Sequence, residues 1–237
     1  MREFGTVGVP NSSLVSEQVF ATLLEAVLSG RYAPGEKLPR QRELAADLGV
    51  TLSSLREALK RLEQMGLLEV RHGDATRVND WRTNGGLDVI AHLLFLGGGL
   101  DAKVLGDVLE ARTLMLGEIA ALAAERRTSE QAALLADLAE RFAAQDDAIG
   151  AAHVDFAFFT EIAQAAGNLV FVLILNAIRR LYFEHLAAVP VTARPQELAP
   201  HYARVATAIG ERDATRARAA AQALAGEQRA RVQELLS

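Results

Sequence analysis

The feature that most constrains this chain is a pair of short apolar-periodic segments joined by one glycine turn. The first, residues 40–48, is predicted to be a helix with Pro39 near its first position, where the missing backbone N–H is tolerated. Gly49 ends this helix, and Thr51 is a natural N-cap for a second helix over residues 52–64. Two short helices joined this closely predict a helix-turn-helix.

The flanking residues extend this motif to a winged helix-turn-helix over residues 12–78. Ser12 or Ser13 can cap a helix that runs to about Ser29, with its apolar residues on one stripe. After the second helix of the motif, two short alternating runs surround a glycine-containing turn at residues 72–75, which predicts a hairpin.

The rest of the chain is predicted to be helical. Residues 79–86 are polar and are interpreted as a linker, and residues 87–237 show a helical period with breaks that delimit six or seven antiparallel helices. Half of the chain is apolar but only 5% is aromatic, which favours packed helices over sheet. The expected fold class is mainly α: an N-terminal winged helix-turn-helix plus a C-terminal all-α antiparallel helical bundle.

The charge is unevenly distributed. The whole chain carries −5, but residues 31–77 carry +2 and the remainder −7. A mildly basic module on an acidic body is compatible with nucleic-acid binding. There is no cysteine, no secretory signal is evident, and the longest apolar run, residues 169–175, is too short to span a bilayer. We therefore expect a cytoplasmic, nucleoid-associated protein with no membrane partner.

The predicted helix over residues 52–64 has the layout of a recognition helix. Its buried stripe is expected to consist of Leu55, Ala58, Leu59 and Leu62. Ser53, Ser54, Arg56 and Lys60 are expected on the other side. Arg56 is best placed for bidentate contact with guanine in the major groove.

Further DNA contacts are expected around this helix. Arg42 on the preceding helix can reach a phosphate or a groove edge, and Thr51, Ser53 and Ser54 can donate to phosphates. At the hairpin tip, His72 and Gly73 can enter the minor groove. Each residue alone is more simply interpreted as solvated surface, but together they favour a DNA-binding face.

Several motifs resemble the DNA-binding domain of the GntR family of transcription regulators: GEKLP at 35–39, RELA at 42–45, LGVT at 48–51 and REAL at 56–59. Beyond them, LAAER at 122–126 and IAQAAGN at 162–168 resemble the FCD sensor domain of the FadR subfamily. Within it, the chain is most similar to acyl-CoA-responsive regulators of fatty-acid metabolism.

The resemblance implies roles for individual residues. Arg42, Thr51, Arg56, His72 and Gly73 match DNA-contacting positions of these regulators, and Ser53 and Ser54 stand where they have threonines. Leu52 departs from the pattern, because a base-contacting arginine is expected there. Losing one bidentate contact changes the discrimination between base pairs by roughly 1–3 kcal/mol, so the operator of these regulators does not transfer directly to this chain.

Many FCD domains hold a divalent metal with one Asp and three His. Asp155 occupies the Asp position here, whereas Phe159, Tyr202 and Leu224 stand at positions aligned with histidines. Because these side chains supply no imidazole, we expect no metal cofactor.

The resemblance implies a small-molecule effector, which is an acyl-CoA in the fatty-acid regulators that the chain resembles. Arg112 and Tyr182 match pocket positions of those relatives, and Asp155 and Tyr202 complete the expected effector site. Arg112 is equally well interpreted as an ion-pair partner of Asp107, of Glu110 or of a neighbouring helix. An apolar interior is expected, as acyl pocket or as plain core, from Phe156, Phe158, Phe159, Phe171, Leu173 and Leu175.

Gln222 and Gly226 replace a pocket tyrosine and serine of those relatives, which weakens the case for acyl-CoA. The alternative is a metal-containing FCD regulator that senses a small organic or sugar acid. An enzyme is not expected, since no activated nucleophile, Gly-rich phosphate loop or catalytic carboxylate pair is evident. One winged helix reads few base pairs, so we expect a homodimer, acting as a repressor or an activator, on palindromic double-stranded operator DNA.

Overall fold

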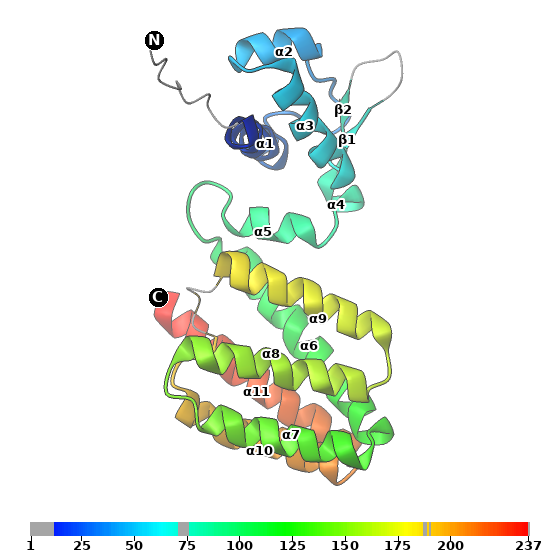
Figure 1. Ribbon diagram of the computed structural model, residues 1–237, viewed down its shortest axis with the longest axis vertical. Helices are drawn as coiled ribbons and strands as arrows, with labels where there is room; N and C mark the ends of the chain where they lie inside the picture. Colours follow the sequence, from blue (N-terminus) through cyan, green and yellow to red (C-terminus); the bar gives the residue numbers. More distant parts are fainter. Residues whose placement is uncertain (1–11, 71–75, 187–188, 190, 237) are drawn as a thin grey trace, which may run out of the picture. The chain divides into compact units, whose positions relative to one another are not determined.

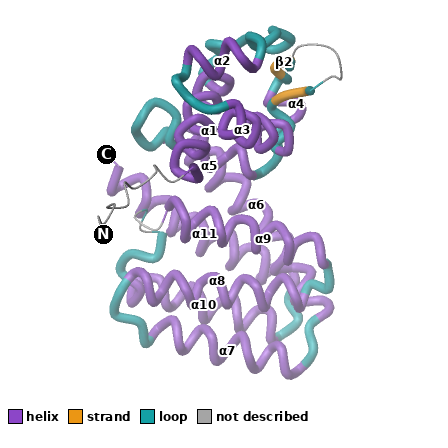
Figure 2. Tube along the Cα trace, turned by 45° about the horizontal axis from the view of Figure 1, so that its top comes forward, coloured by secondary structure: helices purple, strands orange, loops and turns teal. Residues whose placement is uncertain are grey.

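The computed structural model describes residues 12–70, 76–186, 189 and 191–236. By its internal contacts the chain divides into two compact units, and the boundary falls between Asp101 and Ala102. The described part is almost entirely helical (Figures 1 and 2).

The N-terminal unit is a winged helix-turn-helix, as the sequence predicts. Its helices are α1 (Ser12–Leu28), α2 (Gln41–Asp47) and α3 (Leu52–Gln64). Strands β1 (Leu68–Glu69) and β2 (Arg77–Val78) form an antiparallel ladder in which Leu68 pairs with Val78. The predicted stripe of α3 is the centre of this unit, because Leu55, Ala58, Leu59 and Leu62 are each at most 3% exposed.

The turn between α2 and α3 depends on two residues. Gly49 has a φ of +65°, a left-handed conformation that a side chain disfavours. Thr51 then caps α3, with its Oγ1 accepting a hydrogen bond of 3.2 Å from the backbone N–H of Ser54. These two local signals fix where α2 ends and where α3 begins.

The N-terminal unit continues beyond residue 78, through the segment interpreted as a linker. Asp80 caps a short helix, α4 (Trp81–Asn84), by accepting from the backbone N–H of Arg82. The following helix, α5 (Asp88–Leu94), buries Val89 in the same core as α1 and α3. Residues 79–101 therefore pack with the DNA-binding motif because their apolar side chains complete its core.

The C-terminal unit is a bundle of antiparallel helices. It consists of α6 (Ala102–Arg126), α7 (Ser129–Ala143), α8 (Ala148–Ala165), α9 (Leu169–Leu181), the π-helical turn η1 (Tyr182–Leu186), α10 (Pro195–Gly210) and α11 (Ala214–Leu236). Helix α8 packs against α6, α7 and α9, and α11 packs along α6 and α10. Figure 2 shows the layered arrangement.

The expected apolar interior is only partly correct. Phe158, Phe159 and Leu175 are at most 5% exposed and belong to the core. Leu173 is 57% exposed, because two residues advance an α-helix by about 200° and Leu175 occupies the buried side. Phe156 and Phe171 are half-buried. Within the described residues, no helix is long and apolar enough to span a membrane.

Candidate DNA-binding face and effector site

The N-terminal half of α3 and the adjacent end of α2 carry an exposed polar surface. Arg42, Thr51, Ser53 and Arg56 are all exposed. The Nε of Arg56 donates a hydrogen bond of 3.1 Å to Oε1 of Gln41, the first residue of α2. This bond restricts Arg56 at the surface, so less rotamer entropy remains to be lost when its guanidinium binds a base.

Ser54 does not lie on this surface. Its side chain is buried, with 6% of the residue exposed, and its Oγ is 3.1 Å from Oγ1 of Thr51. The expectation of an outward-facing Ser54 is therefore wrong, because a residue four positions before Ala58 lies on the buried side of α3. Ser54 instead supports the helix N-terminus, because its backbone N–H donates a hydrogen bond to the capping Oγ1 of Thr51. His72 and Gly73 lie outside the described residues.

A buried polar network joins four helices of the bundle. At its centre is Asp155 on α8, which is 3% exposed. Its Oδ1 accepts hydrogen bonds from the hydroxyl of Tyr202 on α10 and, at 2.9 Å, from Nε2 of Gln228 on α11. Its Oδ2 lies 3.3 Å from Nη2 of Arg112 on α6. Both carboxylate oxygens are therefore occupied by donors.

Additional hydrogen bonds close this network. Nη1 of Arg112 donates to Oε1 of Gln228 at 2.6 Å, and Nε2 of Gln228 also lies 3.0 Å from Oη of Tyr202. Burial, followed by the charge of Asp155, raises the pKa of Tyr202 well above its usual value, so its phenol stays neutral and acts as a donor. The charges of Arg112 and Asp155 are balanced inside the bundle.

Tyr182, the fourth expected effector residue, is buried but not hydrogen-bonded to this network. Its hydroxyl donates to the backbone carbonyl of Val189 at 3.0 Å. Burial, and secondarily the charge of Asp155, raises the pKa of Tyr182 to about 12. Its ring lies 5.3 Å from that of Phe156 on α8. Thus three of the four expected effector residues, Arg112, Asp155 and Tyr202, are joined directly by an ion pair and a hydrogen bond, both made by Asp155.

Comparison with known proteins identifies both units. Residues 15–78 match the family model "Bacterial regulatory proteins, gntR family", and residues 107–226 match the FCD domain model. The chain is 42% identical over 211 residues to the HTH-type transcriptional regulator Mce2R of Mycobacterium tuberculosis, covering 89% of this chain and 88% of the relative. The chain belongs to the GntR family. Its members are transcription regulators and not enzymes.

Other similarities agree with this membership. A fatty acid metabolism regulator protein of Edwardsiella ictaluri is 34% identical over 160 residues, covering 68% of this chain and 66% of the relative. The fold is shared with E. coli McbR/YncC (TM-score 0.53, 20% identity, 94% of this chain and 99% of that one). It is also shared with Lar, which controls expression of the Listeria monocytogenes agr system (TM-score 0.56, 19% identity, 99% and 100%).

The donor set of this FCD domain does not fit a divalent metal. The resemblance places Phe159, Tyr202 and Leu224 where related domains have histidine ligands, and these three side chains offer no imidazole nitrogen. The described residues contain no group of three His, Cys, Asp or Glu side chains able to hold an ion. The guanidinium of Arg112 supplies the positive charge beside Asp155.

Gln228 is the functional candidate that the sequence interpretation missed. It is 0% exposed and bonds to all three other members of the network. Its spacing contains a usable signal, because it falls on the stripe formed by the buried residues Ala217, Ala221 and Leu224. A glutamine at a core position of an amphipathic helix requires buried hydrogen-bond partners.

Proposed function

We propose that this GntR regulator binds a palindromic operator as a homodimer and that a long-chain acyl-CoA, bound in the FCD domain, releases it from DNA. The buried network of Arg112, Asp155, Tyr202 and Gln228 carries this proposal. A metal-independent polar centre inside an apolar helical bundle suits an effector with one polar group and a long hydrocarbon chain. The similarity to fatty acid metabolism regulators supports the same class of ligand.

The chemistry of Arg112 explains how an acyl thioester would be held. A guanidinium has five N–H donors, and the network uses two of its nitrogens, one toward Asp155 and one toward Gln228. A thioester carbonyl or a phosphate oxygen would compete with Asp155 for Arg112. The acyl chain would replace contacts among the buried rings around Phe159, whose ring centroid is 5.2 Å from the Arg112 guanidinium carbon.

Connectivity supplies a route from this site to DNA. Helix α6 carries Arg112 and begins at Ala102, the first residue after the N-terminal unit. A ligand that displaces Arg112 from Asp155 therefore acts on the helix directly connected to the DNA-binding unit. To shift occupancy from mostly bound to mostly free, the ligand must favour the released conformation by several kcal/mol.

The DNA contacts follow from the exposed surface of α2 and α3. Arg56 would read a guanine, and Arg42, Thr51 and Ser53 would contact phosphates or groove edges. Two copies related by a two-fold axis would place two such surfaces on the half-sites of a palindrome. Such a protein would act as a repressor and would work in the cytoplasm, associated with the nucleoid.

Isothermal titration calorimetry with acyl-CoAs of increasing chain length tests the proposal. Binding should show a negative heat-capacity change that grows with chain length, because each added methylene buries more apolar surface. Free coenzyme A is the matched control and should bind much more weakly. No binding at any length, together with a response of operator affinity to a small carboxylate and a divalent metal, would contradict the proposal and favour a metal-dependent acid sensor.

A further inference from the structure

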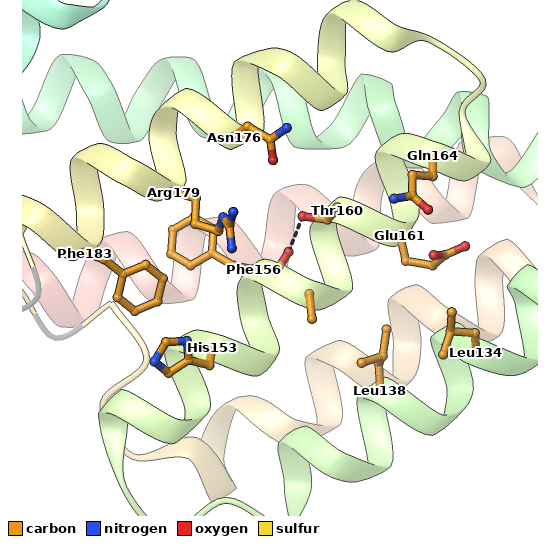
Figure 3. Close-up of a pocket in the computed structure, with 11 residues that line it drawn as sticks. Leu134, Leu138, His153, Phe156, Thr160, Glu161, Gln164, Asn176, Arg179 and Phe183 are labelled. Carbon is orange, nitrogen blue, oxygen red and sulfur yellow. Dashed lines mark hydrogen bonds between the residues drawn. The ribbon is translucent and has the colours of Figure 1, made fainter.

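A groove lies on the side of α8 that faces away from the Asp155 network. It has a volume of about 400 Å³ and is bounded by α7, α8, α9 and η1 (Figure 3). The α8 residues that line it include Phe156 and Gln164, whereas Asp155 points into the bundle core. The groove is therefore separate from the effector site proposed above.

One end of this groove carries a positive charge without a counter-ion. The guanidinium of Arg179 lines it, is exposed, and makes no ion pair or hydrogen bond with any residue that the structure describes. Asn176, one turn earlier on the same face of α9, also lines the groove, and its carboxamide has no hydrogen-bond partner in the described part of the chain. Both side chains offer N–H donors to a ligand.

Aromatic rings form a floor beside this cation. The imidazole of His153 stacks on the ring of Phe183, with centroids 4.4 Å apart and planes inclined by 15°. The ring of Phe156 lies 5.3 Å from that of Phe183. Figure 3 shows Arg179 directed toward these rings from α9. This end of the groove suits a planar anion, which can stack on the rings and pair with the guanidinium.

The opposite end of the groove carries a carboxyl group. Glu161 is eight residues from His153, or about 12 Å along the axis of α8. It is only 9% exposed, and burial raises its pKa, opposed by a hydrogen bond from Gln131. A ligand group that donates a hydrogen bond would find an acceptor here. The groove therefore has a donor end and an acceptor end.

We propose that this groove is a second ligand site, which takes a small aromatic carboxylic acid bearing a hydrogen-bond donor at its far end. The carboxylate pairs with Arg179, the ring stacks on Phe156 and Phe183, and the distal donor meets Glu161. The volume lies within the range of small-molecule sites in proteins.

The first test is calorimetry with 3-(4-hydroxyphenyl)propionate as the probe. Two analogues dissect the contacts: 2-(4-hydroxyphenyl)ethylamine lacks the carboxylate, and 3-phenylpropionate lacks the distal donor. We expect the amine to bind at least tenfold more weakly than the probe and phenylpropionate to bind several-fold more weakly. Failure of the probe to bind at millimolar concentration, or equal binding of the probe and the amine, overturns the proposal.

Two arginine variants locate the bound probe. Arg179→Gln should lower probe affinity at least tenfold without loss of folding, since Arg179 is exposed and has no described partner. Arg180→Gln is the matched control and should leave affinity unchanged, because Arg180 is also exposed but projects about 100° around α9 from Arg179. Equal affinity in Arg179→Gln and the native protein overturns the groove as the site.

A third variant separates the groove from the bundle core. Tyr202→Phe alters the buried network and should leave probe affinity within about twofold of the native value. If Tyr202→Phe abolishes probe binding while Arg179→Gln retains it, the acid binds in the core and the proposal is wrong.

Discussion

Arg112 and Asp155 form an ion pair inside the helical bundle, 43 residues apart in sequence, with side chains only 11% and 5% exposed. The pair is not isolated. Gln228 bonds to both partners, and Tyr202 donates to the carboxylate, so its polar atoms are held by hydrogen bonds from two further helices. Removing one member of such a pair costs much more than its attraction is worth, because the other charge stays buried.

Arg112→Ala should therefore destabilise the bundle by about 3–5 kcal/mol, as expected for one partner of a buried pair. The matched control is Arg218→Ala, which breaks an exposed pair with Glu118 between α11 and α6 and should cost much less, because both side chains are solvated. Urea unfolding followed by circular dichroism measures both. Similar losses in the free energy of unfolding of the two variants would mean that the buried pair stabilises the fold no more than the exposed pair does.

The raised pKa of Tyr182 predicts a loss of stability at alkaline pH. A phenol near its usual pKa of 10 in the unfolded chain and about 12 in the folded protein stabilises the fold below pH 10. This contribution, on the order of 2 kcal/mol, is lost as the pH rises from 10 through 12. We expect the free energy of unfolding of native protein to fall more between pH 9 and 11.5 than that of Tyr182→Phe. Parallel pH profiles for the two proteins would contradict this assignment.

Arg56→Ala should weaken operator binding by roughly 1–3 kcal/mol and relax specificity at one base pair in each half-site. Lys60→Ala, one turn further along α3, is the matched control and should weaken operator and random DNA equally. Fluorescence anisotropy with operator, mutated operator and random duplexes at one salt concentration separates these outcomes. An equal loss for Arg56→Ala on all three duplexes would make Arg56 a phosphate contact.

Ser54→Ala should affect DNA binding only through the geometry of the α3 N-cap. It removes the hydroxyl 3.1 Å from Thr51 but leaves the backbone N–H that Thr51 accepts. We expect a loss of stability below about 1 kcal/mol and an operator affinity close to native. A large loss of operator affinity with unchanged stability would show instead that Ser54 contacts DNA.

Features of the fold that depend on neighbouring residues, such as helix ends, could be predicted from the sequence. Gly49 and Thr51 delimit the helices of the motif, and Thr51 caps α3 as expected. Asp155 and Tyr202 were expected in one site from the family resemblance, and the structure brings them into contact.

Features that depend on helix phase or on distant packing were not predicted. Ser54 was placed on the wrong side of α3, although its distance of four residues from Ala58 puts it on the buried stripe. Residues 79–86 were interpreted as a linker and residues 87–237 as the C-terminal domain, but Val89 belongs to the core of the N-terminal unit, a contact that no local pattern reveals. The sequence did not identify which residue pairs with Arg112. Its partner, Asp155, lies on another helix 43 residues away, and only the tertiary structure brings the two together.

The most direct test of the proposed function measures the affinity of purified protein for fluorescent operator DNA with and without a saturating long-chain acyl-CoA. We expect acyl-CoA to weaken operator binding at least tenfold in native protein, whereas free coenzyme A leaves it unchanged. Tyr202→Phe, which alters the network without removing a buried charge, should bind the operator normally and require more acyl-CoA for release. An operator affinity that acyl-CoAs of every length leave unchanged would contradict the account.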